Sequence, residues 1–329
     1  MSKSSKIATF VALIIIAGCL IVSVFFADQI WFLLRDTISN LSYSAPAEVN
    51  EIADEIKLTN RGKFIFGAST PVIESQTDFN RHCESHDIEI STLGCYNSGK
   101  IYIYNITADE LSGIKESTAA HELMHAVWAR LTDSEQNKLA SSILSVYNDE
   151  KYHADFAKQL EAYSEDEIVE ELHSRLPTEI KNLPDALEKH YKDYFEDQDA
   201  VVDFYEKYRE PFNKLENELK DLSEELETLR TKLEGMQETY QKDSEQLSRA
   251  VDEFNNCAST TNCFASNYEF NTKRAELSAK QVALNNLYQE LSTLVDDYNK
   301  KVDKYNNNLL RGEELDSMMN SNREINNIK

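Results

Sequence analysis

The chain has 329 residues and a formal net charge of -24 at pH 7, from 58 acidic and 34 basic side chains. This excess of negative charge argues against nucleic acid and anionic lipid headgroups as partners. Only 8 glycines and 5 prolines are present, which favours long helices over a turn-rich β fold.

The first predicted element is a membrane-spanning helix over residues 7–27, IATFVALIIIAGCLIVSVFFA, which holds no charged side chain. At about 1.5 Å per residue, a helix of this length spans roughly 30 Å, the thickness of a bilayer core. Lys3 and Lys6 precede it and Trp31 follows it. This pattern is typical of a single-pass cell-membrane protein whose N-terminus is cytoplasmic and whose remaining chain lies outside the cytoplasm.

Two other interpretations of this segment stay open. The run IAGC, which ends at Cys19, is similar to a bacterial lipoprotein box, although the residues after it remain mostly apolar to Phe26. A cleaved signal peptide would need a shorter apolar core and a small-residue exit. The length of the apolar run favours the uncleaved anchor over both.

The four cysteines beyond Cys19 form two local pairs, Cys83 with Cys95 and Cys257 with Cys263. In an oxidising compartment such pairs close small loops as disulfides, which agrees with a location outside the cytoplasm. Four free thiols or a metal cluster are the alternatives, but the C-x-x-C spacing typical of zinc ribbons is absent.

The segment after the anchor predicts an α+β domain with mostly helices. Residues 47–60 read as a short amphipathic helix, and the mixed segment GKFIFGASTPVIES as extended chain. Two alternating runs, 88–95 and 100–106, surround the turn signal YNSG and predict a β-hairpin. The helices predicted after it lie at 133–148, 152–163 and 165–176, the last ended by Pro177.

The helix that follows the hairpin is expected to begin with a capping box, with Thr107 as N-cap and Glu110 three residues later. Gly113 is a candidate for dividing this helix into a short and a longer part.

Residues 201–312 predict a coiled coil. Apolar residues from Leu215 to Tyr240 follow a 4-3 spacing, and a second heptad run extends from Leu277 to Tyr305. The turn-rich stretch NNCASTTNCFASN separates the two runs. We expect an antiparallel hairpin within one chain, and pairing with another chain is the alternative.

The segment His121-Glu122-Leu123-Met124-His125 is the strongest chemical signal. On a helix, His121 and His125 share one face and can bind one metal ion. Glu122 lies about 100° around the helix, where it can reach a water molecule on that metal without binding the metal itself. The spacing therefore predicts a Zn2+ site with Glu122 as general base for peptide hydrolysis.

A helix with HELMH after a strand resembles the zincin metallopeptidases. In the metzincin branch a glycine and a third histidine follow, and Trp128 and Leu131 occupy the matching positions here. The resemblance is therefore to the gluzincins, in which a glutamate on a later helix is the third ligand. It also implies that a strand beside the cleft, for which residues 101–105 are the candidate, pairs with an extended peptide, and a plain sheet strand is the alternative for these residues.

The candidates for the third ligand lie on the helix before Pro177 and are Glu167, Glu170, Glu171 and His173. We predict Glu171, because it flanks the apolar face and because the segment Glu171-Leu172-His173-Ser174 is similar to the gluzincin run in which serine follows the ligand by three residues. Glu167 and His173 are the alternative ligands. Glu179 is a candidate to orient a ligand histidine. In the gluzincins an aspartate often follows the glutamate ligand by four residues, and Arg175 occupies that position here.

The predicted organisation resembles that of uncharacterised single-pass proteins of small-genome bacteria. Its parts are a cytoplasmic tip (1–6), a transmembrane helix (7–27), a juxtamembrane linker (28–46), a zincin-like domain (47–200), a coiled-coil hairpin (201–312) and a polar tail (313–329).

Two functions follow from this organisation. The first is a membrane-anchored zinc endopeptidase that acts on a protein or peptide outside the cytoplasm. The second is a surface interaction or spacer protein, with the coil as the working part, a possible coiled-coil partner and a non-catalytic zincin-like scaffold.

Overall fold

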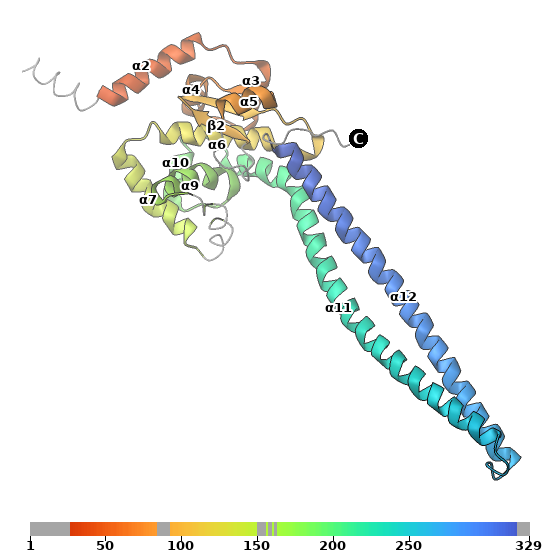
Figure 1. Cartoon of the computed structure of the whole chain (residues 1–329). Coiled ribbons are helices and arrows are strands. Elements are labelled where there is room, and N and C mark those ends of the chain that lie inside the picture. Colours follow the sequence, from red (N-terminus) through yellow and green to blue (C-terminus); the bar gives the residue numbers. More distant parts are fainter. Residues whose placement is uncertain (1–26, 84–92, 150–155, 157–159, 161–162, 321–329) are drawn as a thin grey trace, which may run out of the picture. The chain divides into compact units, whose positions relative to one another are not determined.

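The computed structural model describes residues 27–83, 93–149, 156, 160 and 163–320 (Figure 1). The chain is mostly helical with one small sheet, as predicted for an α+β fold with mostly helices. It divides into two compact units. The first comprises the chain up to Pro211 together with the part from Asp316 onward, and the second comprises Phe212–Leu315.

The described part of the first unit holds one sheet and the following elements: α2 (Ala27–Ser42), α3 (Ala47–Glu55), α4 (Asn60–Ala68), β1 (Val72–Glu74), α5 (Gln76–His82), β2 (Gly94–Asn97), β3 (Lys100–Tyr104), η1 (Asp109–Leu111), α6 (Ile114–Trp128), α7 (Asp133–Tyr147), α9 (Glu165–Glu179) and α10 (Asp185–Tyr191). Two long helices, α11 (Gln198–Ala258) and α12 (Asn267–Met319), form most of the second unit.

The predicted membrane helix falls almost entirely outside the described residues, with only Ala27 inside them. Among the helices that the structure does describe, none is both long and apolar enough to cross a bilayer. The predicted linker over residues 28–46 is largely helical, because α2 occupies it up to Ser42.

The sheet has the strand order β1-β3-β2, with β1 parallel and β2 antiparallel to β3. Strands β2 and β3 form the predicted hairpin, and Asn97 pairs with Lys100 across a turn in which Ser98 and Gly99 both have positive φ. This two-residue turn matches the twist of the strands. The first predicted strand, 88–95, corresponds to β2, which extends beyond the predicted end to Asn97, and its residues 88–92 lie outside the described part.

The predicted role of residues 101–105 as a substrate-pairing edge strand is wrong. β3 lies at the centre of the sheet and has a hydrogen-bonded neighbour on each side. A strand paired on both sides has no free backbone groups for a further strand, so residues 101–105 form a plain sheet strand, and β1 and β2 are the edges of the described sheet.

The segment GKFIFGAS, predicted to be extended, is helical in α4. The side chain of Thr59 accepts a hydrogen bond from the Gly62 nitrogen and caps the helix. A Cβ at Gly62 would lie 2.3 Å from the Tyr194 carbonyl oxygen. The glycine is therefore required by a close approach between two segments, and this contact is invisible in the local sequence.

Two predicted helix ends also differ. Thr107 does not cap a helix: η1 follows Ala108 without a side-chain cap, and α6 starts after Gly113, whose φ of 101° interrupts the chain. Helix α9 continues through Pro177 to Glu179. The Tyr191 hydroxyl donates to the His173 carbonyl oxygen at 3.0 Å, which is the carbonyl that a proline at position 177 cannot satisfy.

The other predicted helices are found where they can be examined. Helix α7 matches the prediction, α9 begins where it was predicted to begin, and both start with a capping box. The predicted helix 152–163 lies mostly outside the described residues, but Phe156 and Leu160 are buried.

Helix α6 lies at the centre of the first unit, where it packs against the sheet on one side and against α9 on another (Figure 1). Small side chains at Ala119, Ala120 and Ala126 are fully buried and let these elements approach closely. The core is therefore built around the helix that carries the histidine pair.

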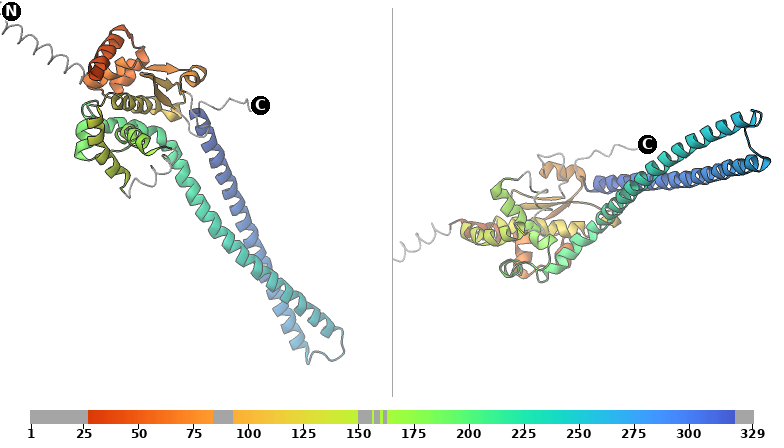
Figure 2. Two further views of the ribbon diagram at one scale, coloured as in Figure 1. Left: turned by 60° about the vertical axis from the view of Figure 1, so that its left-hand side comes forward. Right: turned by 90° about the horizontal axis from the view of Figure 1, so that it is seen from below.

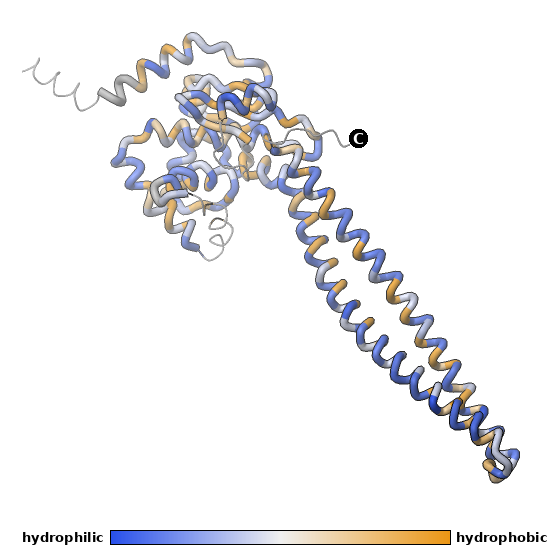
Figure 3. The backbone as a smooth tube through the Cα atoms, in the orientation of Figure 1, coloured by the Kyte–Doolittle hydropathy of each residue, from blue (hydrophilic) through white to orange (hydrophobic). Residues whose placement is uncertain are grey.

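In the second unit, α11 and α12 run antiparallel as a hairpin (Figure 2). Contacts between them join rising positions on α11 to falling positions on α12: Glu218 with Asn308, Glu225 with Lys301, Tyr240 with Tyr288, and Phe254 with Phe270. Apolar residues recur along both helices (Figure 3), and Leu222, Leu247 and Leu284 are buried. The predicted polar tail is helical up to Met319.

Both predicted cysteine pairs are disulfides. Cys83–Cys95 joins the end of α5 to β2, and Cys257–Cys263 lies between α11 and α12. Both disulfides close short loops: the cysteines of the first are 12 residues apart in the sequence, and those of the second are 6 residues apart.

Candidate metal centre

The position of α6 is fixed by its first residues. A Cβ at Gly113 would lie 2.6 Å from the Phe204 carbonyl oxygen, on a backbone conformation that side chains rarely adopt. This glycine allows the chain to turn sharply into α6 while α6 stays close to the start of α11. Most side chains of α6 are buried. His121 and His125 are only partly buried, and they face α9.

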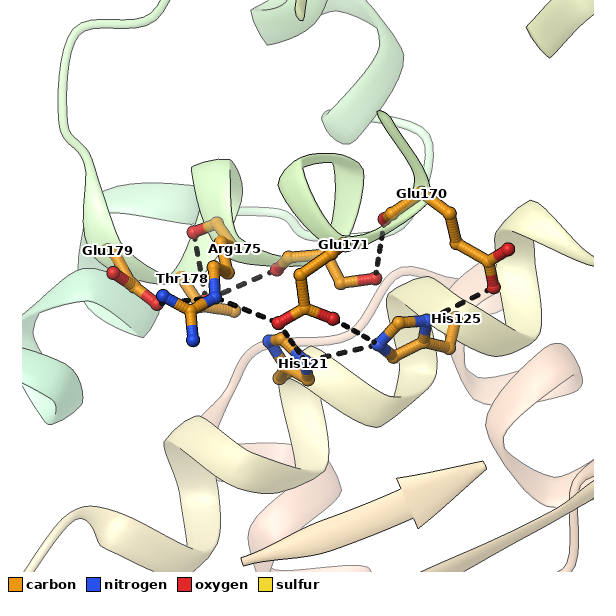
Figure 4. Close-up of polar contacts among 8 residues, drawn as sticks. His121, His125, Glu170, Glu171, Arg175, Thr178 and Glu179 are labelled. Atoms are coloured by element: carbon orange, nitrogen blue, oxygen red, sulfur yellow. Dashed lines mark hydrogen bonds and ion pairs between the residues drawn. The ribbon is translucent and has the colours of Figure 1, made fainter. Parts of the chain in front are cut away.

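The two histidines and one glutamate converge. The Nε2 atoms of His121 and His125 lie 3.1 Å apart. Glu171 places one carboxylate oxygen 3.8 Å from Nε2 of His121 and the other 3.3 Å from Nε2 of His125. One ligand atom from each residue lies within 4.8 Å of the other two. Figure 4 shows the carboxylate of Glu171 directed at both imidazoles.

This group fits a zinc ion by its chemistry. Two imidazole nitrogens and one carboxylate oxygen are a donor set that zinc accepts in catalytic sites, where a fourth position remains for water. The group therefore could hold a metal ion, and the predicted third ligand Glu171 is the glutamate that reaches both histidines.

Neighbouring side chains hold these ligands. The Oε1 atom of Glu170 lies 3.3 Å from Nδ1 of His125, and a carboxylate in this position fixes the tautomer and orientation of a ligand histidine. On the other side, Nε of Arg175 donates to Glu171 at 2.8 Å. His125 is thus held by a contact between α6 and α9, and Glu171 by a contact within α9 (Figure 4).

The electrostatics of the group depends on its burial and its close charges. Burial by itself lowers the pKa of His125, but hydrogen bonds to Glu170 and Glu171 and nearby negative charges outweigh it and raise that pKa to about 10. Burial lowers the pKa of His121 to about 3, against the opposing charge of Glu171. Burial also favours the neutral form of Glu171, but the two histidines and Arg175 hold its pKa well below the usual range.

Glu122 lies beside this group and against β2, where a Cβ at Gly94 would be 2.9 Å from its Oε1 atom, and the residue is 5% exposed. Burial raises the pKa of Glu122 to about 7, and the negative charge of Glu171 adds to this shift. The charge of His125 and a backbone hydrogen bond from Tyr96 oppose it. A carboxyl group with such a pKa can accept and return a proton near neutral pH.

A cavity of about 450 Å3 opens over the group. Its residues come from β2 and its preceding residue, α6, α9, the start of α11 and Tyr163. The end away from β2 is lined by Thr178, Glu179, Tyr205 and Tyr208. The candidate ligands and Glu122 therefore share one open space that a substrate could enter.

The other predicted candidates have different tasks. Glu167 accepts hydrogen bonds from the backbone and hydroxyl of Ser164 and so caps α9. His173 is fully buried, packs on Trp128 and lies 2.8 Å from His190 between their Nε2 atoms. Glu179 contacts neither His121 nor His125 in any described interaction and is 3.9 Å from Arg175.

The sequence does not indicate the contacts of two residues at the site. Arg175 departs from the gluzincin pattern, yet it donates to the predicted ligand Glu171. Glu170 is among the candidates for the third ligand, but it contacts Nδ1 of His125 from behind instead. The spacing Glu171 to Arg175, four residues on one helix, is a signal that could have indicated this pair.

No protein-family model, no curated protein and no solved structure matches this chain.

Proposed function

We propose that the chain is a zinc-dependent endopeptidase, anchored in the cell membrane by residues 7–27 and active outside the cytoplasm. The observation that carries the proposal is the convergence of His121, His125 and Glu171 next to the buried Glu122, in an open cavity. The gluzincin-like use of a glutamate from a later helix supports the same proposal.

His121, His125 and Glu171 would hold the zinc ion. A zinc ion at such a site lowers the pKa of a water molecule and polarises a carbonyl group. Glu122 takes a proton from the attacking water and delivers it to the leaving amine, a task suited to its raised pKa. Glu170 keeps His125 in the tautomer that presents Nε2 to the metal.

Strand β2 suits an extended peptide substrate. In β2, Asn97 pairs with Lys100 next to the turn, and the Leu93 carbonyl accepts a hydrogen bond from Tyr104. Because backbone groups alternate in direction along an antiparallel strand, those of Gly94 and Tyr96 point away from β3. Both residues line the cavity. A peptide added along this edge would pass over Glu122, and main-chain hydrogen bonds of this kind need no particular side chain.

Tyr163 is the candidate donor to the oxygen of the reacting carbonyl. It lines the cavity, and burial raises its pKa, with Glu171 and Glu122 adding to the shift and Arg175 opposing it. The charges of both Glu122 and Glu171 raise the pKa of Tyr163, whereas neither contributes to the raised pKa of Tyr205 or Tyr208 in the same cavity. A neutral phenol so placed can donate a hydrogen bond to developing negative charge.

The test is cleavage of an unstructured protein by the full chain with added zinc, with chelator, and as Glu122→Gln. We expect hydrolysis that depends on zinc and falls by at least about 100-fold in Glu122→Gln, since loss of a general base costs this much. Zinc binding should be retained in the variant. Equal hydrolysis by Glu122→Gln and the natural chain would contradict the mechanism.

The second candidate is an interaction or spacer protein whose working part is the hairpin. The observation in its favour is a row of partly exposed apolar side chains along α12, in which Tyr288 is 55%, Val295 42% and Leu309 42% exposed, although Tyr288 also contacts Tyr240 of α11. These positions recur every seven residues or a multiple of it, as on a helix with a further partner. This function predicts that Glu122→Gln has no effect on the protein's role, whereas charged substitutions along this row abolish it.

A further inference from the structure

Helix α2 turns its polar side toward the first unit and its apolar side outward. Asp36 is buried and Asn40 is partly buried, whereas Leu34 is 55%, Ile38 67% and Leu41 85% exposed. Leu34, Ile38 and Leu41 follow the 4-3 spacing of one helix face. A surface helix of a soluble unit has the opposite arrangement, with the apolar stripe facing the core.

The inward side of α2 is firmly attached. Both carboxylate oxygens of Asp36 accept from Arg130, at 2.6 and 2.9 Å. Asn40 donates to the Phe64 carbonyl oxygen at 2.6 Å, and the hydroxyl of Tyr43, just after α2, donates to the Pro71 carbonyl oxygen at 2.5 Å. These contacts fix the outward direction of Leu34, Ile38 and Leu41, and a rotation of α2 that buried these side chains would break the hydrogen bonds.

The sequence before α2 indicates what covers this face. The apolar run that begins at Ile7 ends at Ala27, the first residue of α2. If this run crosses a bilayer, as the proposed function requires, α2 starts at the bilayer surface. An apolar helix face that begins there is suited to lie in the boundary between headgroups and acyl chains.

We propose that α2 lies along the outer membrane surface with Leu34, Ile38 and Leu41 in the lipid, and thereby holds the first unit against the bilayer. The contact is apolar, so neutral lipid suffices, which agrees with a chain of net charge -24 that anionic headgroups would repel. Arg130 lies two residues after the end of α6 and also donates to the Tyr96 hydroxyl on β2. Its ion pair with Asp36 therefore connects α2 to the elements around the candidate metal centre.

The position of Leu41 distinguishes this arrangement from a helix that stands out from the membrane. Fourteen residues of helix rise by about 21 Å, so a helix perpendicular to the bilayer would carry Leu41 into water. A helix lying on the surface keeps Leu41 at the depth of the acyl boundary.

The experiment uses the full chain with Cys19→Ser and Leu41→Cys, spin-labelled without reductant so that both disulfides stay closed, in phosphatidylcholine nanodiscs with one chain each. The matched control carries the label at Ser141, an exposed position on α7. Accessibility to oxygen and to a water-soluble nickel chelate is measured by electron paramagnetic resonance. We expect a severalfold higher oxygen-to-nickel ratio at position 41 than at position 141.

A label at position 41 that is as open to nickel as the one at position 141 would overturn the proposal. So would protection in vesicles, where chains can meet, together with exposure in single-chain nanodiscs, because a second copy would then cover α2. The measurement needs no hydrolysis, so a chain that fails to cleave peptides but shows the expected depth loses the proposed function and keeps this inference.

Discussion

Glu170 and Glu171 are consecutive on α9, yet they take different positions around the histidine pair. Glu171 reaches Nε2 of both histidines, whereas Glu170 contacts only Nδ1 of His125. The step of about 100° between neighbours on a helix accounts for the difference. One carboxylate can therefore complete the ligand set while the next one orients a ligand from behind.

Glu171→Gln should reduce zinc affinity by more than about tenfold, because the substitution removes the charge of a ligand and its balance with Arg175. Glu170→Gln should have a smaller effect. Glu167→Gln is the matched control, since Glu167 lies on the same helix but caps it at Ser164. Zinc affinity measured by competition with a chromogenic chelator tests all three, and normal binding by Glu171→Gln would refute the assignment.

Zinc binding should release close to one proton between pH 7 and pH 9. Without metal, His125 keeps its proton up to a pKa of about 10, whereas His121, with a pKa of about 3, is already neutral. A ligand histidine must lose its proton, so the apparent affinity should rise by about tenfold per pH unit below pH 10. Calorimetry in buffers of different ionisation enthalpy counts the protons, and a count of zero would contradict the raised pKa.

The same shift predicts the stability of the metal-free protein. The folded-state pKa of His125 lies above the unfolded value of 6.5. The stabilisation from its protonated form is therefore complete below pH 6.5 and is lost as pH rises toward 10.

Among the elements, β2 lies directly against the part of α6 that carries Glu122. A Cβ at Gly94 would lie 2.6 Å from Cγ2 of Thr118 and 2.8 Å from Cγ of Glu122. The disulfide from Cys83 to Cys95 holds the next residue of the strand. The edge strand thus lies directly on the predicted general base because glycine occupies this position.

Gly94→Ala should displace β2 from α6 and lower the rate of peptide cleavage, with zinc affinity unchanged because the atoms nearest to the added methyl group belong to Thr118 and Glu122 and not to a candidate ligand. Gly235→Ala is the control. Nothing lies within 4 Å of the added atom there, so this exposed helix position should gain about 0.5–1 kcal/mol of stability. Thermal unfolding and kinetic assays of both variants measure the effects, and an undiminished cleavage rate in Gly94→Ala would argue against β2 as part of the site.

At the scale of the whole molecule, the chain combines a compact unit that holds the metal centre with a separate helical hairpin. The hairpin has few fully buried side chains, and its two helices are joined by polar pairs such as Lys301 with Glu225, 2.6 Å apart. Exposed pairs of this kind contribute little stability, so the covalent connection between α11 and α12 is important for keeping them together.

The hairpin should form within one chain. With Cys19→Ser as background, Glu225→Cys together with Lys301→Cys should be joined within the monomer by a short bismaleimide, because these positions are in contact. Glu225→Cys alone is the control and should give no cross-linked product. Denaturing electrophoresis separates the products, and a dimer band from the double variant would show that the helices pair between chains.

The sequence by itself determined the features that depend on one segment of chain. The spacing of His121, Glu122 and His125 needs only the geometry of a helix, and the heptads of α11 and α12 and the two cysteine pairs are equally local. Glu171 is the predicted third ligand among several candidates on its helix, and the structure brings its carboxylate close to both histidines.

The tertiary structure decided the features that depend on contacts between distant segments. Helix α4 forms where extended chain was expected, because Gly62 lies against the Tyr194 backbone. Helix α9 passes through Pro177, since Tyr191 satisfies the carbonyl left without a partner. The order of the strands made β2 an edge, and the packing of α9 on α6 gave Glu170 and Arg175 their places at the site. Local propensity cannot decide such features, because the groups that satisfy these backbone and charged atoms come from elsewhere in the chain.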